Sequence, residues 1–324
     1  MRRLPLALGA MIFAAASGCS SLPIVSRAPT ERWGFTAPWD PRSAASVSVN
    51  AGRLDAIVSG WIALDSVTGL PLDLYRDSLV HSARRMALVT SCHGARFHPE
   101  LLRRLAMDSL ALKQVAGAIG DRLQRDGYRG AVIDLEGMTS ADTALTRAVV
   151  ATMADNMRRR GVGPVVVAVP ASDTAGYPAR LFETSADLLL VMLYDEHWAT
   201  SPPGAIADPG WVRRSLATRV AEVGASRLVA SLPLYGYVWR MNGAPAAAIS
   251  FDDARRLATE AGVALERDPA TQTLRAMRTD GDRWELWVSD AALLTVLERE
   301  VSAMNVRRVA YWRLGLEDAG VWLR

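Results

Sequence analysis

Residues 128–137 read Tyr-Arg-Gly-Ala-Val-Ile-Asp-Leu-Glu-Gly. The apolar run from Ala131 to Ile133 is typical of a strand covered on both faces. Side chains of a strand alternate between its faces, so the carboxyl groups of Asp134 and Glu136 are expected to point the same way. Neighbouring carboxylates repel, so one of them is expected to hold a proton near neutral pH. The pattern indicates either an acid pair used in catalysis or a strand end with two solvated acids.

Seven other stretches share this short apolar character. With residues 130–135, the predicted strands are 33–37, 56–62, 86–91, 165–169, 188–193, 228–232 and 309–312. Apolar residues at helical spacing between them predict helices at 99–107, 108–125, 141–160, 211–223 and 290–304, with Ser140 and Ser289 as expected caps. Eight strands alternating with helices predict an α/β fold, a (β/α)8 TIM barrel with its site at the carboxyl ends of the strands. A doubly wound open sheet is the alternative, but no glycine-rich nucleotide loop follows the first strand.

The connection between the seventh and eighth predicted strands is longer than one helix requires. Within it, residues 274–278 and 284–288 flank Thr-Asp-Gly-Asp at 279–282, which is a hairpin signal. The sequence therefore predicts a small α+β insertion at about 248–290, between strands 7 and 8.

The N-terminus reads as an export signal. Arg2 and Arg3 precede an apolar run over residues 4–16, followed by Ser-Gly and Cys19. The cysteine after small residues resembles a bacterial lipobox, in which Cys19 carries the lipid. The expected segments are a signal peptide at 1–19, a tether at 20–31 and the folded domain at 32–324. This predicts a cell-envelope protein anchored to a membrane; plain secretion, periplasmic location or an uncleaved anchor are the alternatives.

Charge and cysteine content limit the other functions. The chain has 37 basic and 34 acidic residues, and Lys113 is the single lysine. The basic residues do not cluster in sequence into a basic face, so no nucleic-acid partner is expected. Cys92 would be the only cysteine of the folded domain, and its neighbour His93 would point to the opposite face of a strand, which disfavours a nucleophilic pair. No metal or cofactor is expected, and the chain is expected to be a monomer.

Large aromatic residues recur where the predicted strands end. The chain has 10 Trp against 5 Phe, and five tryptophans follow or end strands: Trp39, Trp61, Trp198, Trp239 and Trp312. Sugar rings stack their apolar faces on such side chains, while their hydroxyls need polar partners. The alternative is that the tryptophans pack the barrel. His197 lacks a second histidine at ligand spacing, so a hydrogen-bonding role is preferred over a metal role.

Four ordered motifs carry a resemblance to a known family. Gly-Ala-Val-Ile-Asp-Leu-Glu at 130–136, Met-Leu-Tyr-Asp at 192–195, Leu-Pro-Leu-Tyr-Gly-Tyr-Val-Trp at 232–239 and Trp312 resemble the signatures of family 18 glycoside hydrolases. This is the chitinase-like group, and the match is similar to its bacterial branch with Tyr-Asp-Glu-His-Trp, found here at 194–198. The resemblance implies a (β/α) barrel with an α+β insertion after the seventh strand.

The resemblance also implies roles for individual residues. Glu136 matches the general acid, Asp134 the acid that orients the substrate's 2-acetamido group, and Tyr194 the hydroxyl that holds the acetamido carbonyl. Asp195 matches a polar support of the site. The expected substrate-binding residues, from these motifs and from the strand ends, are Trp39, Trp61, Met192, His197, Trp198, Tyr235, Tyr237, Trp239 and Trp312. The implied mechanism is retaining and substrate-assisted, without a protein nucleophile.

The sequence departs from the family pattern at two positions. Val132 and Arg129 stand where aspartates are common, and Val132 shares the face of Asp134, so a residue that could exchange its proton is missing. The expected function is cleavage of β-linked N-acetylglucosamine-containing polysaccharide, such as peptidoglycan, an envelope glycan or a chitin-like polymer. The alternative is a weakly active or inactive glycan-binding protein. A metal-dependent deacetylase lacks a ligand constellation.

Overall fold

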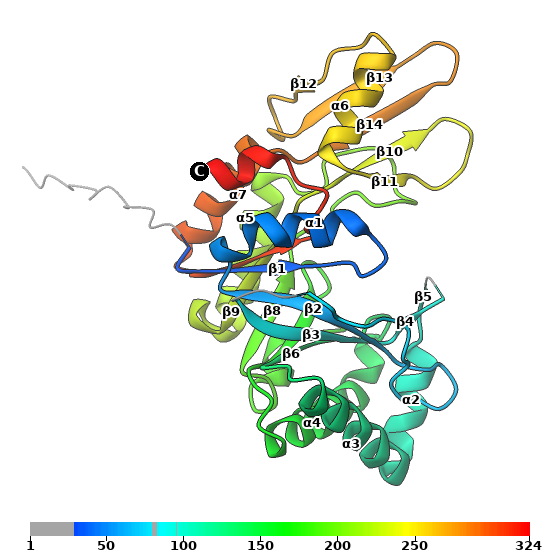
Figure 1. The fold of residues 1–324 in the computed structure, drawn as a ribbon, viewed down its shortest axis with the longest axis vertical. Coiled ribbons are helices and arrows are strands. Elements are labelled where there is room, and N and C mark those ends of the chain that lie inside the picture. Colours follow the sequence, from blue (N-terminus) through cyan, green and yellow to red (C-terminus); the bar gives the residue numbers. More distant parts are fainter. Residues whose placement is uncertain (1–28, 80–82, 95) are drawn as a thin grey trace, which may run out of the picture.

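The computed structural model describes residues 29–79, 83–94 and 96–324. Its centre is a closed barrel of eight parallel strands (Figure 1). In chain order the strands are β1 (Glu31–Phe35), β2 (Ala56–Ala63), β3 (Arg84–Thr90), β6 (Ala131–Asp134), β7 (Val165–Pro170), β8 (Leu188–Met192), β9 (Leu228–Pro233) and β15 (Arg308–Trp312). The barrel closes because β15 pairs with both β9 and β1. The predicted (β/α)8 TIM barrel is confirmed, and the open sheet is excluded.

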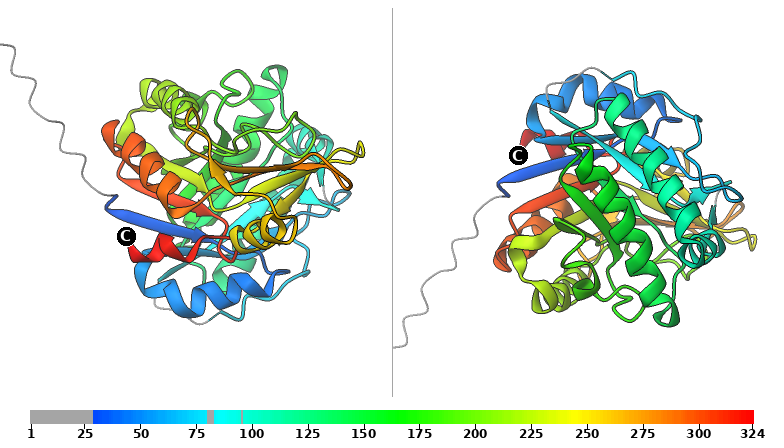
Figure 2. Two further views of the ribbon diagram at one scale, coloured as in Figure 1. Left: turned by 90° about the horizontal axis from the view of Figure 1, so that it is seen from above. Right: turned by 90° about the horizontal axis from the view of Figure 1, so that it is seen from below.

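Helices lie around the barrel, which Figure 2 shows from above and from below. They are α1 (Pro41–Asn50), α2 (Pro99–Met107), α3 (Ser109–Arg125), α4 (Thr143–Arg159), α5 (Pro209–Val223) and α7 (Ala291–Ala303). Short 3-10 turns are η1 (Ala51–Arg53), η2 (Ser140–Asp142), η3 (Ala179–Phe182), η4 (Ala225–Arg227) and η5 (Ala319–Leu323). The sequence did not predict α1, whose buried side is only Ser43, Val47 and Asn50. So little apolar surface leaves a weak periodic signal.

The two predicted serine caps are wrong. Thr139 and Asp142 form a capping box around η2, directly before α4, and Ser140 lies inside that turn. At α7 the side chain of Asp290 accepts a hydrogen bond from the Leu293 amide at 2.9 Å, so the cap follows Ser289 by one residue. At α7 the charged oxygens of Asp290 suit the free amides of the helix start, whereas the N-cap of η2 is Thr139.

A five-stranded antiparallel sheet lies between β9 and β15 in sequence, at the upper end of the molecule in Figure 1. Its elements are β10 (Gly236–Arg240), β11 (Ala247–Ile249), α6 (Phe251–Glu260), β12 (Glu266–Arg267), β13 (Leu274–Arg278) and β14 (Trp284–Val288). The predicted insertion and its hairpin are confirmed, but the sheet begins at Gly236, before the expected 248. A Cβ at Gly236 would lie 2.1 Å from the Trp287 carbonyl oxygen, so only glycine fits where β10 meets β14.

Two apolar layers hold the barrel together. An outer layer lies between the strands and the helices. An inner layer fills the barrel with side chains that include Trp33, Met86, Val132 and Leu190. Because the interior is packed, a binding site can form only above it, at the strand ends. A small hairpin there, β4 (Cys92–His93) with β5 (Arg96–Phe97), follows β3.

The predicted signal peptide at 1–19, with Cys19, and most of the tether at 20–31 lie outside the described residues. Glu31 already belongs to β1. Over the part of the chain that the structure describes, no helix has the length and apolar character needed to cross a membrane.

Candidate active site

Asp134 and Glu136 lie at the carboxyl end of β6. Thr90 ends the adjacent strand β3, in register with Asp134, and its hydroxyl donates a hydrogen bond to Asp134 Oδ2 at 3.1 Å. The other oxygen, Asp134 Oδ1, is buried without a hydrogen-bond partner. Val132 precedes Asp134 by two residues on the same face and is fully buried in the inner layer. An apolar side chain therefore stands where a donor to Oδ1 could have been.

The two departures from the family pattern lie in different places. Arg129 precedes β6 and is exposed at the opposite end of the strand from Asp134. Val132 lines the same cavity as Asp134 and Glu136. Only Val132 can therefore affect the acid pair by contact.

The environment of the acid pair favours one retained proton. Burial raises the pKa of Glu136 to about 8, and the negative charges of Asp134 and Asp195 act in the same direction. Burial raises the pKa of Asp134 to about 6, although the hydrogen bond from Thr90 favours its ionised form. Near neutral pH the proton of the pair therefore lies on Glu136, which is the state required of a general acid.

Tyr194 and Asp195 follow β8, across the barrel mouth. Asp195 has a φ of 58°, a left-handed conformation that is uncommon for a residue with a side chain. Tyr235 donates a hydrogen bond to its carboxyl group, and the Tyr237 ring packs edge-on against Tyr235. Burial raises the pKa of Tyr194 well above its usual range, so its hydroxyl remains a donor.

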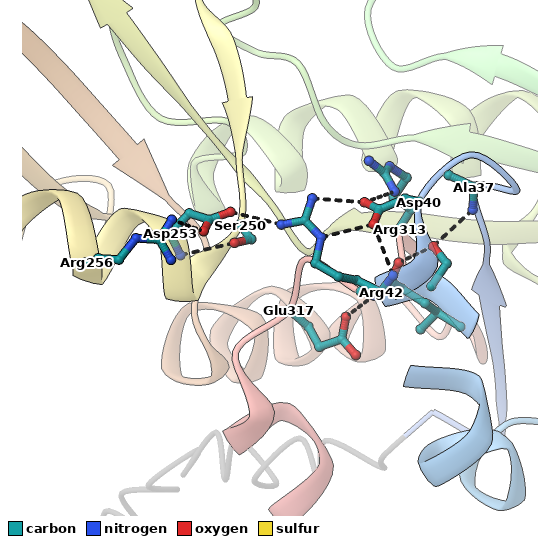
Figure 3. Close-up of polar contacts among 11 residues, drawn as sticks. Ala37, Asp40, Arg42, Ser250, Asp253, Arg256, Arg313 and Glu317 are labelled. Atoms are coloured by element: carbon teal, nitrogen blue, oxygen red, sulfur yellow. Dashed lines mark hydrogen bonds and ion pairs between the residues drawn. The ribbon is translucent and has the colours of Figure 1, made fainter. Parts of the chain in front are cut away.

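Trp312 ends β15 and faces Tyr194. Their rings stack with centroids 6.0 Å apart and planes 15° apart, and Phe35 packs edge-on at 5.4 Å from the Trp312 ring. The next residue, Arg313, donates to Asp40 Oδ2 at 3.0 Å. The aromatic floor of the site is thus continuous with an ion-pair network below the insertion (Figure 3).

That network joins three distant segments. Asp40 caps α1 and binds both Arg42 and Arg313, and Arg42 also reaches Asp253 of α6 at 2.9 Å (Figure 3). The Arg42 and Arg313 guanidinium groups hold the pKa of Asp40 at about 2 despite its burial. The start of α1, the segment after Trp312 and the insertion are therefore fixed relative to one another.

Two cavities meet at Glu136. One, of about 240 Å³, is lined by residues that include Trp61, Cys92, Val132, Asp134 and Trp312. The other, of about 460 Å³, is lined by residues that include Asp173, Glu196, Trp198 and Trp211. The residues common to both are Glu136, Met192, Tyr194 and Asp195. A polymer passing through both cavities would place a bond beside the protonated carboxyl group.

The structure leaves some of the expected site residues outside these cavities. Trp39 is half exposed and packs edge-on against Trp61, with centroids 4.7 Å apart. His197 Nδ1 lies 3.0 Å from the Pro202 carbonyl oxygen, within its own loop. Three others, Tyr235, Tyr237 and Trp239, lie in the apolar layer between the barrel mouth and the insertion sheet.

Several lining residues were not expected from the sequence. Trp211 is the third residue of α5, and Asp173 lies in the loop after β7. Phe35 and Phe97 line the smaller cavity. The β-to-α loops and the helix starts of a barrel lie at the carboxyl ends of its strands. The position of Trp211 just after Pro209-Gly210, at a predicted helix start, could therefore have predicted that it lines the site.

The described residues do not favour metal-dependent or thiol-based catalysis at this site. Within residues 29–79, 83–94 and 96–324, no three His, Cys, Asp or Glu side chains converge in a way that could hold a metal ion. Burial and the charges of Asp134 and Glu136 raise the pKa of the Cys92 thiol, which disfavours the reactive thiolate.

No family model matches this sequence. In sequence the chain is similar to cortical fragment-lytic enzymes and glycosylases of Bacillus. The cortical fragment-lytic enzyme of Bacillus subtilis is 25% identical over 252 residues, which cover 74% of this chain and 58% of that protein. The chain thus spans less than two thirds of that relative's length.

Solved structures share the fold. The spore cortex-lytic enzyme SleL of Bacillus megaterium superimposes with a TM-score of 0.79 at 21% identity, covering 90% of this chain and 72% of that one. A class V chitinase from Pseudomonas fluorescens gives a TM-score of 0.77 at 21% identity, covering 91% of this chain and 98% of that one. These likenesses extend over the insertion as well as the barrel.

Proposed function

We propose that this protein is a glycoside hydrolase that cleaves β-linked N-acetylglucosamine-containing polysaccharide. The observation that carries the proposal is the position of Glu136, a carboxyl group with a raised pKa at the junction of two aromatic-lined cavities. Retained protonation near neutral pH suits donation of a proton to a leaving glycosidic oxygen.

The mechanism we propose is retaining and substrate-assisted. The acetamido oxygen of the sugar attacks its anomeric carbon while the glycosidic C–O bond breaks, and the leaving oxygen takes the proton of Glu136. Ionised Asp134 stabilises the positive oxazolinium intermediate, and Tyr194 donates a hydrogen bond to the acetamido group. Glu136 then removes a proton from water, which opens the oxazolinium ring and restores the enzyme.

We propose a bacterial wall or envelope glycan as the substrate. Similarity to a cortical fragment-lytic enzyme supports a wall polymer as the substrate. Similarity to the chitinases among the solved structures supports N-acetylglucosamine as its sugar unit. Trp61, Trp198 and Trp312 supply apolar faces for sugar rings along the two cavities.

The test is the release of reducing ends from N-acetylglucosamine oligomers and from peptidoglycan by the wild type and by Glu136→Gln. The matched control is Glu300→Gln, since Glu300 pairs with Arg213 on the outer helices. We expect products from the wild type and the control, and none from Glu136→Gln. Binding without products from all three proteins would refute an enzyme. For the mechanism, NMR of the first product should show the β-anomer; the α-anomer would exclude retention.

One observation favours a second function, a glycan-binding protein with little or no turnover. Val132 is apolar and Asp134 Oδ1 has no hydrogen-bond partner, so on the side of the inner layer Asp134 lacks a group that could exchange its proton. The same assay distinguishes the two functions, because only the binding protein would retain oligomers without shortening them.

We also propose that the protein is exported and held at a membrane through a lipid on Cys19, and that it is a monomer. The lipobox-like Ser-Gly-Cys supports the first part. Mass spectrometry of the membrane fraction should find acyl chains on Cys19, and an unmodified N-terminal peptide would refute the anchor. Light scattering of the folded domain should give the mass of one chain.

A further inference from the structure

The barrel's amino-terminal end carries an arc of arginines. Six consecutive strands around the barrel, in the order β9, β15, β1, β2, β3 and β6, have at least one arginine at or just before their first residues. These arginines are Arg227, Arg307, Arg308, Arg32, Arg53, Arg84, Arg85 and Arg129. Sequence spacing gave no sign of such a face, because the residues come from six separate segments.

Part of this arc has a structural role. Arg84 and Arg308 both pair with Glu31, and Arg85 pairs with Asp77 at 3.0 Å. Arg227 donates to the carbonyl oxygens of Glu183 and Ala186. These contacts join neighbouring segments at the amino-terminal end of the barrel.

Four other arginines of the arc have no such partner. In the described part of the chain, the side chains of Arg32, Arg53, Arg129 and Arg307 make neither an ion pair nor a hydrogen bond. Arg53 and Arg129 are exposed, and Arg32 and Arg307 are partly exposed. Arginines at helix ends are explained by the helix dipole, but Arg32, Arg129 and Arg307 stand at strand starts, where that explanation does not apply.

The chain enters the fold inside this arc. The backbone amides of Thr30 and Glu31 donate to the Arg307 carbonyl oxygen at 2.9 Å and 3.2 Å, so the segment that leads back to Cys19 joins the domain beside Arg307 and Arg32. Cys19 precedes Glu31 by 12 positions, a length that reaches about 40 Å at most when extended. A lipid on Cys19 would keep this end of the barrel near the membrane.

The cavities at the opposite end of the barrel are lined by carboxyl groups. Asp134, Glu136, Asp173, Asp195 and Glu196 line the two cavities, and no lysine or arginine lines either of them. A negatively charged membrane surface would therefore attract the arginine end and repel the mouth.

We propose that the arginine arc is a docking surface for anionic phospholipid headgroups, which orients the protein with its catalytic mouth facing away from the membrane. Phosphate oxygens accept hydrogen bonds from guanidinium groups in a fork geometry, which suits unpaired arginines on a rigid rim. In this arrangement the tether and the arc act on the same face, and the mouth faces the wall polymer. The docking surface does not depend on the proposed catalytic activity.

The test is co-sedimentation with vesicles of phosphatidylglycerol or of phosphatidylcholine. The chain from residue 20 is suitable, since every element of the closed barrel lies within residues 29–324. The variant is Arg53→Glu/Arg129→Glu/Arg307→Glu. The matched control, Arg147→Glu/Arg255→Glu/Arg283→Glu, makes the same charge change at exposed positions elsewhere. Circular dichroism melting checks that both variants fold, and a glutamine version of the first variant tests charge loss without reversal.

We expect the wild type and the control to bind phosphatidylglycerol vesicles, and the arc variant to bind at least about tenfold more weakly, because each arginine near the surface contributes measurably. Binding should disappear at about 0.5 M salt, since counterions screen exposed charges at that concentration. Equal binding to phosphatidylcholine, no binding by the wild type, or equal loss in both triple variants would overturn the proposal. Hydrolysis of soluble oligomers should be unchanged in the arc variant.

Discussion

The hydroxyl of Thr90 donates a hydrogen bond of 3.1 Å to Oδ2 of Asp134 across the adjacent strands β3 and β6. Its other oxygen, Oδ1, has no hydrogen-bond partner, but the neighbouring Glu136 also favours the ionised form of Asp134. The ionisation of Asp134 therefore depends on Thr90 from the adjacent strand and on Glu136 beside it.

Thr90→Val should move the acidic limb of the pH–activity profile to higher pH. The hydrogen bond favours the ionised form of Asp134, so its loss raises a pKa that burial has already raised. The expected shift is about 1–2 pH units, because a hydrogen bond to a charged group contributes about 1.5–3 kcal/mol. The measurement is kcat/KM against pH. Thr152→Val, which loses only a bond to its own helix, is the control. An unmoved limb in Thr90→Val would separate Asp134 from catalysis.

Val132→Asn should shift the same limb in the opposite direction. An amide at this position can donate to Asp134 Oδ1, which stabilises the carboxylate and lowers its pKa. The change should also lower the free energy of unfolding by about 1–3 kcal/mol, because a polar group enters an apolar layer. Val166→Asn is the control, since Val166 is the register partner of Val132 on β7. Similar profiles for both variants would contradict a specific contact with Asp134.

Glu136→Gln should stabilise the fold at alkaline pH while it abolishes turnover. The raised pKa of Glu136 means that the folded state holds a proton that the unfolded state has released above its ordinary value of 4.5. Stability of the wild type therefore falls as pH rises toward about 8, and the glutamine variant avoids this loss. We expect a melting temperature higher by about 2–5 °C at pH 9 and no difference at pH 4. A constant difference across this range would contradict the proton assignment.

The same assignment predicts the alkaline limb of activity. A general acid must hold its proton, so kcat/KM should fall as pH rises through the raised pKa of Glu136, about 8. A profile that stays level to pH 10 would place the proton donor elsewhere.

Tyr194→Phe should lower kcat by about 100-fold, which is the usual effect of removing one hydrogen-bond donor to a charge that develops in the transition state. The ring remains stacked on Trp312, so the fold and the melting temperature should be little changed. The pH profile should keep its shape, because the Tyr194 hydroxyl stays protonated throughout. Tyr128→Phe, whose hydroxyl contacts Asp77 at the lower end of the barrel, is the control. Full activity in Tyr194→Phe would refute its role.

The sequence alone predicted the positions of the barrel strands and the shared direction of Asp134 and Glu136. Each barrel strand is a short apolar run between turn residues, because it is covered on both faces, and this signal is local. The two-residue period of a strand likewise placed Val132, Asp134 and Glu136 on one face. The sequence did not predict helix α1, because this helix buries little apolar surface. The N-caps of η2 and α7 lie one residue away from the expected serines.

Tertiary structure decided which distant groups meet. The register of β3 against β6 brings Thr90 to Asp134, and barrel closure brings Trp312 onto Tyr194 and Arg313 onto Asp40. The arginine arc arises in the same way, because closure places six separate strand starts side by side. Local patterns report burial and direction along one segment, whereas contacts between segments depend on register and closure, which no single segment contains.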